Sequence, residues 1–335
     1  MAFERFMEIS LYDPDGFFGG EVLRSEKAGD FLTSPEVSPL FGETLALYVE
    51  GIKQAIGDPF NIVEVAAGSG SLLRSLLAAL PVDAIAVEAS PAARTALAAI
   101  VPVREHLPET IRGVVIANEL LDNLPTALAQ RTPQGWRERW VGVDDDDLVF
   151  VDAPARPEVI AWLDDYAGPV PVGGWVEVQL AARAWVIDVL HRLEMGAVLL
   201  IDYGDTAENL LPRRSDGTLR TYRSHHLGPH PLDEPGETDI TSDVNFTALM
   251  DLHPGATLSR QDDFLTDLGL RERLSEIRRQ ELEMARSGDE SQRLRLRATK
   301  TEAETLLHPR GLGDFRVLVF EKLGTDATTG ASYLS

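Results

Sequence analysis

Acidic and amide side chains stand at the ends of two apolar runs, and their types set the chemistry that the chain could perform. The run "VVIANELLDNLPT" passes directly into Asn118, Glu119, Asp122 and Asn123, and the run "GAVLLIDYGD" ends in Asp202. Carboxylates in such positions can hold a cation, orient a nucleophile or accept a proton. This density of polar groups after buried strands favours a functional site. The alternative is structural, with Asp122 and Asn123 capping the next turn and Asp202 capping a loop.

A short glycine turn follows another apolar run, in "FNIVEVAAGSGSL". Gly68 and Gly70 would let a ligand approach the backbone N–H groups closely. A dinucleotide fingerprint needs a third glycine where Leu73 stands, and a phosphate-binding loop needs a lysine that is missing. Glu64 lies within the strand, and Glu88, 20 residues after Gly68, ends the next apolar run. Because a carboxylate there can accept both ribose hydroxyls, the pattern predicts an adenosine-bearing cofactor. A tight connection that binds nothing is the alternative.

These side chains can meet only if their strands end at one edge of a sheet. The strand-like runs "NIVEVA", "AIAVEA", "GVVIAN" and "GAVLLIDYG" alternate with helix-like segments at 71–80, 91–100 and 178–193. Continuous apolar strands separated by helices indicate a parallel sheet that is covered on both faces. We therefore predict an α/β, doubly wound, mostly parallel sheet, with the acids facing one crevice at the carboxyl ends of the strands.

Two segments interrupt this alternation. The first, about 127–175, alternates with a period near two and predicts a small antiparallel insertion, in which the aspartates at 144–147 form a hairpin turn. The second, about 204–310, begins with a Pro/Gly/His-rich stretch at 204–236 that we expect to be structureless, and continues into an Arg/Glu-rich helical segment from Leu270 to Ala303. The predicted division is a cap at 1–58, a core at 59–323 and a disordered tail at 324–335. Packing is predicted for four tryptophans, Trp136, Trp140, Trp175 and Trp185.

The composition of the chain limits which partners it could bind and in which compartment we expect it. The chain has 31 Lys and Arg against 54 Asp and Glu, a net charge of -23, which would repel nucleic-acid phosphates and anionic lipid. No apolar run reaches the ~18 residues that cross a bilayer. Because the chain has no cysteine and its first residues show no secretory signal, we predict a cytoplasmic protein without disulfides. The histidines of "HHLGPH" lack a recognised ligand spacing, and no metal is predicted.

Six strings together carry a resemblance to a known family. They occur in the order "GDFLTSPEVSPLFGE", "VEVAAGSGSL", "ANELLDNLP", "LLIDYGD", "TLRTYRSHH…PLDEPGETDITSDVNFTAL" and "GLGDFRVLVF". The chain resembles the MidA-type S-adenosylmethionine-dependent methyltransferases, a bacterial and mitochondrial family whose mitochondrial members methylate an arginine on a respiratory complex I subunit. The resemblance implies a seven-stranded Rossmann-like methyltransferase sheet with a smaller inserted lobe, S-adenosyl-L-methionine as cofactor, and a protein substrate that could be a respiratory complex subunit. A homodimer is also predicted.

The resemblance also implies roles for particular residues. Gly68 and Gly70 match the motif I glycines, Glu88 matches the ribose-binding acid, and the segment around Thr33 matches one that closes over the cofactor. The implied cofactor-binding set is Thr33, Ser34, Glu36, Glu64, Ala66, Gly68, Ser69, Gly70, Glu88 and Asn118. Ala66 and Ala67 depart from the family pattern, which has glycine and proline there. If Ala66 needs a positive φ, alanine at that position lowers stability or affinity.

For an arginine acceptor, we predict an acidic clamp as the catalytic group. Glu119 and Asp122 would hold the guanidinium and take a proton, with Asp202 in support. Two other functions stay open on the sequence. A non-catalytic partner-binding or assembly module is favoured by Ala66 and Ala67. A NAD-dependent oxidoreductase is disfavoured by the missing third glycine.

Overall fold

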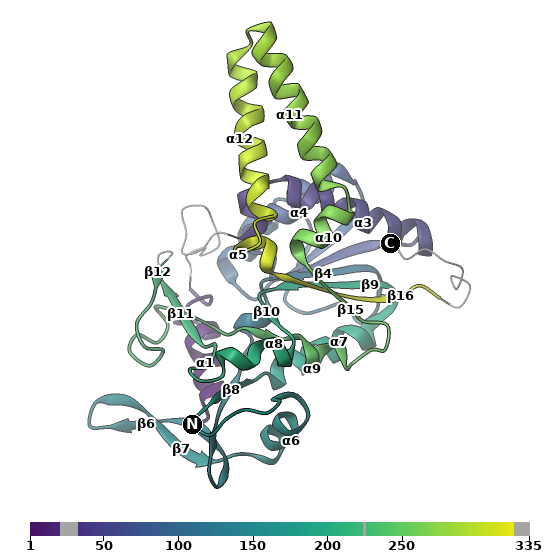
Figure 1. Cartoon of the computed structure of the whole chain (residues 1–335). Coiled ribbons are helices and arrows are strands. Elements are labelled where there is room, and N and C mark those ends of the chain that lie inside the picture. The colour runs from purple at the N-terminus through teal and green to yellow at the C-terminus, as the bar shows by residue number, and fades with distance from the viewer. Residues whose placement is uncertain (21–32, 224–225, 325–335) are drawn as a thin grey trace.

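The computed structural model describes residues 1–20, 33–223 and 226–324. At its centre is a seven-stranded sheet in the order β15-β16-β9-β4-β1-β2-β3 (Figure 1). The strands are β1 (Asn61–Val65), β2 (Asp83–Val87), β3 (Val103–Arg104), β4 (Ile111–Asn118), β9 (Leu193–Asp202), β15 (Thr257–Arg260) and β16 (Arg316–Lys322). The strands from β3 to β9 pair in parallel, whereas β16 and β15 pair antiparallel. The predicted α/β fold with a mostly parallel sheet is confirmed.

Alternate residues of the central strands enter two cores, one on each face of the sheet. On β4, Val114 and Ile116 belong to one core, and Val115 and Ala117 to the other. The first face is covered by α3 (Leu40–Ile56), α4 (Ser71–Ala79), α5 (Pro91–Leu97) and α10 (Gln261–Asp267), and the second by α7 (Leu180–Arg192) and α9 (Phe246–Met250). Because both faces are buried, apolar residues occupy both faces of the central strands, and their sequences show no period of two.

A second sheet forms from residues that lie between β4 and α7. It has the order β7-β6-β5-β8, and all its pairs are antiparallel. Its elements are β5 (Ala127–Thr132), β6 (Gly135–Asp144), β7 (Asp147–Pro154), α6 (Pro157–Tyr166) and β8 (Trp175–Val178). Asp144 pairs with Asp147, which confirms the aspartate run as a hairpin turn. The N-terminal helix α1 (Phe3–Tyr12) packs Phe3 and Met7 into the same cluster as Leu128 of β5.

The stretch at 204–236 contains short regular elements, so the expectation of a structureless loop is wrong. The elements that follow β9 are β10 (Gly204–Asp205), α8 (Ala207–Leu210), η2 (Leu211–Arg213), β11 (Arg220–Arg223), β12 (His226–Leu227), β13 (Asp239–Thr241) and β14 (Val244–Asn245). The strands pair across long separations, β10 with β14 and β11 with β13. Such pairing leaves no periodic signal within the stretch itself, which explains the error. Ser224 and His225 lie outside the described residues.

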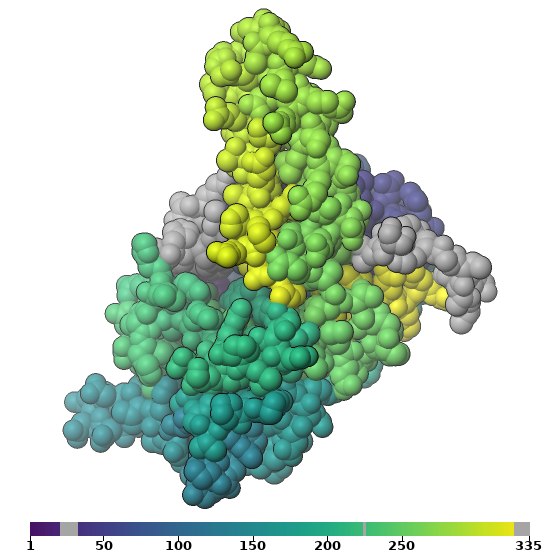
Figure 2. All heavy atoms as spheres, viewed as in Figure 1, coloured from purple at the N-terminus to yellow at the C-terminus, as the bar shows by residue number. Residues whose placement is uncertain are grey.

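The Arg/Glu-rich segment folds as two helices that stand out from the body of the molecule (Figures 1 and 2). They are α11 (Leu270–Ser287) and α12 (Glu290–Leu306). Gly288 ends α11 with a φ of 83°, a conformation that glycine adopts readily, and Lys300 pairs with Glu281 at 2.8 Å across the hairpin.

Three further short helices are α2 (Ser34–Val37), η1 (Leu121–Asn123) and η3 (Leu312–Asp314). None of the helices in the described part of the chain combines the length and apolar character that spanning a membrane requires. The predicted disordered tail falls almost entirely outside the described residues, and the predicted domain boundaries stay a prediction.

Candidate active site

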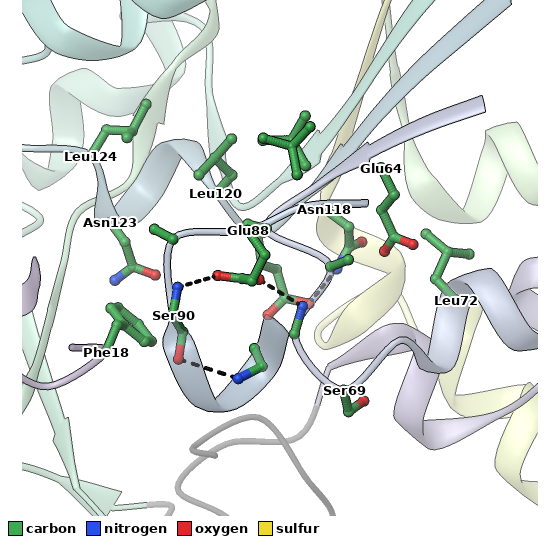
Figure 3. A pocket seen from close by; sticks show the side chains of 18 of the residues that line it. Phe18, Glu64, Ser69, Leu72, Glu88, Ser90, Asn118, Leu120, Asn123 and Leu124 are labelled. Atoms are coloured by element: carbon green, nitrogen blue, oxygen red, sulfur yellow. Dashed lines mark hydrogen bonds between the residues drawn. The ribbon is translucent and has the colours of Figure 1, made fainter. Parts of the chain in front are cut away.

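A cavity of about 480 Å³ opens at the carboxyl ends of β1, β2 and β4 (Figure 3). Nine residues of the predicted site line it, namely Thr33, Glu36, Glu64, Ala66, Gly68, Ser69, Glu88, Asn118 and Glu119. The other predicted site residues, Ser34, Gly70, Asp122 and Asp202, are not among the residues that line it. The parallel sheet thus brings residues from separate strand ends to one edge, as its topology requires.

The turn after β1 uses its two glycines differently. Both have positive φ, 52° at Gly68 and 75° at Gly70. A Cβ on Gly70 would lie 2.5 Å from the Ile100 side chain and 2.9 Å from that of Leu97. Gly70 is therefore needed for close packing beneath the turn, while Gly68 faces the cavity. The predicted cofactor contact at Gly70 has no support in this geometry.

Ala66, the first residue after β1, has a φ of 55°. Its N–H donates to the carbonyl oxygen of Val87 at 2.9 Å, which holds it in this conformation. A residue with a Cβ costs roughly 1–2 kcal/mol in the left-handed region. The departure from the family pattern therefore lies at a strained position on the cavity wall.

Glu88 ties the turn after β1 to the start of α5. Its Oε2 accepts the N–H of Gly68 at 3.0 Å, and its Oε1 accepts the N–H of Ser90 at 2.8 Å. Burial raises the pKa of this carboxyl, and the backbone hydrogen bonds oppose that shift. A carboxylate has further lone pairs, so Glu88 can still accept hydroxyl groups from a ligand in the cavity.

Two buried oxygens at the cavity lack a hydrogen-bond partner within the described chain. They are Oε2 of Glu64 and Oδ1 of Asn118, whose residues are 4% and 8% exposed. Burial, followed by the proximity of Glu88, raises the pKa of Glu64 from 4.5 to about 8. Buried polar atoms without partners are destabilising unless a ligand or water satisfies them. Their placement indicates a ligand that offers hydrogen-bond donors.

Glu119 follows β4 directly and has a φ of 54°. Its N–H donates to the carbonyl oxygen of Ile201 at 2.8 Å, and its Oε1 accepts Nδ2 of Asn118 at 3.0 Å. Burial, followed by the charge of Asp122, raises its pKa to about 8, against the effect of hydrogen bonds from Asn118 and the Ser34 backbone. The arrangement places a proton-accepting group on the cavity wall.

Asp122 and Asp202 lie behind that wall. Oδ2 of Asp202 accepts the N–H groups of Leu121 at 2.8 Å and Asp122 at 3.3 Å. Asp122 accepts the hydroxyls of Tyr203 and Thr241. Burial raises the pKa of both carboxyls. Because neither lines the cavity, the prediction that they contact a substrate is not supported, and their contacts are those of positioning residues.

The segment before α3 joins the turn after β1. Thr33 and Glu36 form a capping box on α2, with the Thr33 N–H 3.4 Å from Oε2 of Glu36. Oε1 of Glu36 accepts the hydroxyl of Ser69 at 3.2 Å, while Ser34 hydrogen-bonds Gln261 instead of facing the cavity. The predicted closing segment therefore contacts the turn through Glu36.

Several lining residues are outside the predicted set of site residues. They are Tyr12, Phe18, Pro35, Glu105, His106, Leu107, Asn123, Leu124, Trp185, Asp188 and Arg192, among others. Of these, the sequence singles out Asn123 as one of the polar groups that follow a strand. For Trp185, the sequence predicts a packing role. Trp185 does pack against the core of the second face, yet it also borders the cavity. The signal that could have pointed to members of this set is their place in the six strings, which contain Pro35, Asn123 and Leu124.

Comparison with known proteins identifies the family. The sequence profile of the S-adenosyl-L-methionine-dependent methyltransferase family Methyltransf_28 matches residues 44–261, more than half of the chain. The chain belongs to this methyltransferase family. It is a methyltransferase whose cofactor is S-adenosyl-L-methionine, as the sequence predicts.

Solved and curated relatives cover most of the chain. A Burkholderia thailandensis protein, whose crystal structure contains S-adenosyl-homocysteine, is 32% identical, with a TM-score of 0.85 over 96% of this chain and 88% of that chain. The human protein arginine methyltransferase NDUFAF7, mitochondrial, is 29% identical over 81% of this chain and 70% of its own length. Its Drosophila melanogaster homolog is 27% identical over 66% of this chain and 59% of its own length.

The predicted cytoplasmic location is contradicted by these relatives. The human, bovine and Drosophila proteins are mitochondrial. The prediction depended on the absence of cysteine, which excludes disulfides but does not distinguish one reducing compartment from another.

Proposed function

We propose that this methyltransferase transfers its methyl group to a guanidinium nitrogen of an arginine in a protein substrate. The observation that carries the proposal is Glu119, a half-buried carboxyl on the cavity wall whose pKa is raised to about 8. A group with that pKa can accept the proton that a guanidinium loses when it is alkylated. The curated relatives, which are named as protein arginine methyltransferases, support the same acceptor.

The residues present fit the cofactor. The unpartnered oxygens of Glu64 and Asn118 are acceptors, and they complement the ammonium and hydroxyl donors of S-adenosyl-L-methionine. We assign the ribose hydroxyls to Glu88 and the close backbone contact to Gly68, with Thr33, Glu36, Ser69 and Ala66 around them. When bound, the cofactor supplies a methyl group that is already electrophilic on its sulfonium.

Glu119 holds the guanidinium and receives its proton. An arginine cation next to Glu119 favours the ionised carboxylate and so lowers its pKa from the raised value. On methyl transfer, Glu119 would take the proton that the methylated guanidinium nitrogen loses, and S-adenosyl-homocysteine would leave as the other product.

Asp202 and Asp122 act through Glu119 and the loop that follows it. Asp202 fixes the backbone of Leu121 and Asp122 by two hydrogen bonds, and the charge of Asp122 helps to raise the pKa of Glu119. We therefore place Asp122 and Asp202 as positioning residues. A respiratory complex subunit as the substrate and a homodimer both stay predictions.

The test is transfer of labelled methyl from S-adenosyl-L-methionine to proteins of the host cell, followed by mapping of the modified residue. We expect the label on arginine with the wild-type chain. Glu119→Gln keeps the side-chain volume and an oxygen that accepts hydrogen bonds, but it loses the basic group. We expect this variant to bind the cofactor with unchanged affinity and to lose methyl transfer. Glu281→Gln, which removes a carboxylate from the helical hairpin, is the control and keeps transfer.

Three results would reject the proposal in distinct ways. Label on a residue other than arginine rejects the acceptor, and undiminished transfer by Glu119→Gln rejects its catalytic residue. Calorimetry that detects no binding of S-adenosyl-L-methionine rejects the fit of the cavity and favours the non-catalytic module.

A further inference from the structure

Asn123 borders the cavity and has no role in the function proposed above. It ends η1, directly after the loop that carries Glu119, and is 8% exposed. A cap of the local turn would be the simplest account of an asparagine here. Its hydrogen bonds, however, run to distant parts of the chain.

Every polar group of Asn123 except its side-chain oxygen already forms a hydrogen bond within the protein. Nδ2 donates to Oδ1 of Asp239 at 2.7 Å and to the carbonyl oxygen of Ile240 at 3.1 Å. The backbone oxygen accepts the hydroxyl of Tyr12 at 3.1 Å, and the backbone hydrogen-bonds the Asp122 carboxyl. An amide nitrogen has two hydrogens, so both of its donors are committed.

These contacts fix which end of the amide faces the cavity. The opposite orientation would place Oδ1 against two other acceptors, those of Asp239 and Ile240, and would lose both hydrogen bonds. Figure 3 shows Asn123 with its oxygen turned toward the cavity and its nitrogen turned away.

The side-chain amide of Asn118 has the same orientation, with its nitrogen bonded inside the protein and its oxygen free among the described residues. Its Nδ2 donates to Glu119, and its Oδ1 is one of the buried oxygens without a partner in the described chain. Both amides on this wall thus turn their oxygens to the cavity. The Asn118 oxygen is assigned to the cofactor above, which leaves the Asn123 oxygen for the methyl acceptor. A guanidinium has five N–H donors and no acceptor, which matches such a wall.

We propose that Asn123 is a specificity-determining residue, whose side-chain oxygen accepts a hydrogen bond from the guanidinium of the methyl acceptor. The inference rests on the proposed arginine acceptor. The Asn123 oxygen would also discriminate against the ureido group of citrulline. That group has nearly the same shape as the guanidinium, but its oxygen is an acceptor and cannot donate a hydrogen bond to Asn123.

The test compares Nα-acetyl-arginine amide with Nα-acetyl-citrulline amide, titrated by ligand-observed NMR into the full chain loaded with S-adenosyl-homocysteine. We expect the wild type to prefer the arginine compound by roughly 10- to 100-fold, as for a hydrogen bond to a charged group. Asn123→Ala reduces this preference severalfold and leaves the affinity for S-adenosyl-homocysteine unchanged.

Asn245→Ala is the matched control. Asn245 is also buried, and its Nδ2 donates to the carbonyl oxygen of Tyr166 at 3.0 Å, but it does not line the cavity. This variant loses a similar internal hydrogen bond and keeps the full preference for arginine.

The inference is overturned if Asn123→Ala binds S-adenosyl-homocysteine and keeps the arginine preference, or if the wild type shows none. Should Asn123→Ala fail to bind S-adenosyl-homocysteine, Asn123→Ser decides. Its shorter side chain keeps a hydroxyl donor on the side of Asp239 but no longer extends a carbonyl oxygen toward the acceptor, so the arginine preference is again reduced severalfold, and a full preference overturns the inference. Failure of the proposed function is distinguishable from failure of this inference, because the methyl label would then map to a residue other than arginine.

Discussion

The turns that follow β1 and β4 have the same backbone conformation, but the side chains at their first residues differ in function. In each, the first residue after the strand is in the left-handed region, Ala66 at 55° and Glu119 at 54°. In each, its N–H donates to the neighbouring strand, to Val87 at 2.9 Å and to Ile201 at 2.8 Å. Only Glu119 places a reactive group on the cavity wall. The strain therefore positions a functional side chain at one turn and a methyl group at the other.

An acid with a pKa raised to about 8 lies next to each turn, the buried Glu64 within β1 and the half-buried Glu119 directly after β4. After burial, the largest raising influence is Glu88 for the first acid and Asp122 for the second. Glu64 belongs with the residues assigned to the cofactor, and Glu119 with those assigned to the acceptor. The comparison predicts that matched substitutions at the two acids separate binding from transfer.

The largest effect is expected for Glu119→Gln. Loss of a positioned proton acceptor lowers the turnover number by roughly 100- to 10,000-fold, measured with saturating cofactor and the protein substrate. Glu64→Gln, assayed in the same way, retains turnover to within about tenfold, because its contact is made equally before and during transfer. Equal losses in the two variants would contradict the division of labour between the turns.

For cofactor affinity, the larger effect is expected for Glu64→Gln and the smaller one for Glu119→Gln. Glu64→Gln weakens binding of S-adenosyl-L-methionine by roughly 10- to 100-fold, because the cofactor ammonium favours the ionised form of Glu64 and glutamine cannot ionise. Glu119→Gln changes the dissociation constant by less than about threefold. Calorimetry on both variants provides the measurement, and an unaffected Glu64→Gln would remove Glu64 from the cofactor site.

The two acids also predict how stability depends on pH. Both have pKa values raised from 4.5 to about 8 in the folded chain, so folding takes up protons between these values. The free energy of unfolding of the cofactor-free protein therefore falls as the pH rises from about 5 to 8, and this contribution levels off above pH 8. The fall is on the order of a few kcal/mol for each acid.

Urea unfolding across this pH range measures the effect. Glu64→Gln and Glu119→Gln together flatten the fall, since neither glutamine titrates. A fall that is unchanged in the double variant would show that other groups cause it.

The smallest effect concerns the strain at Ala66. Ala66→Gly removes the Cβ from a left-handed position and raises the free energy of unfolding by about 1 kcal/mol. Ala67→Gly is the neighbouring control, since Ala67 is 7% exposed, packs in the first core and is not among the residues with positive φ. It lowers stability by about 1 kcal/mol. Urea unfolding compares them, and destabilisation by Ala66→Gly would mean that the methyl group itself is needed.

The sequence predicted much of the site because the signals there are local. Glu64, Gly68 and Glu88 stand at fixed offsets from apolar runs, and parallel strands bring such offsets to one edge. The roles of Asp202 and Asn123 could not be predicted in this way. Asp202 bonds the backbone of Leu121, 81 positions away, and Asn123 bonds Asp239, 116 positions away.

The sequence alone determined the sheet, the family and the side chains at the strand ends, because apolar runs, a glycine turn and short motifs are properties of neighbouring residues. Tertiary structure decided which acids border the cavity and which lie behind it, since Asp122 and Glu119 are three positions apart and differ only in what packs around them. It also decided which end of the Asn123 side chain faces the cavity. Direction and burial depend on contacts between distant segments, and no local pattern records those contacts.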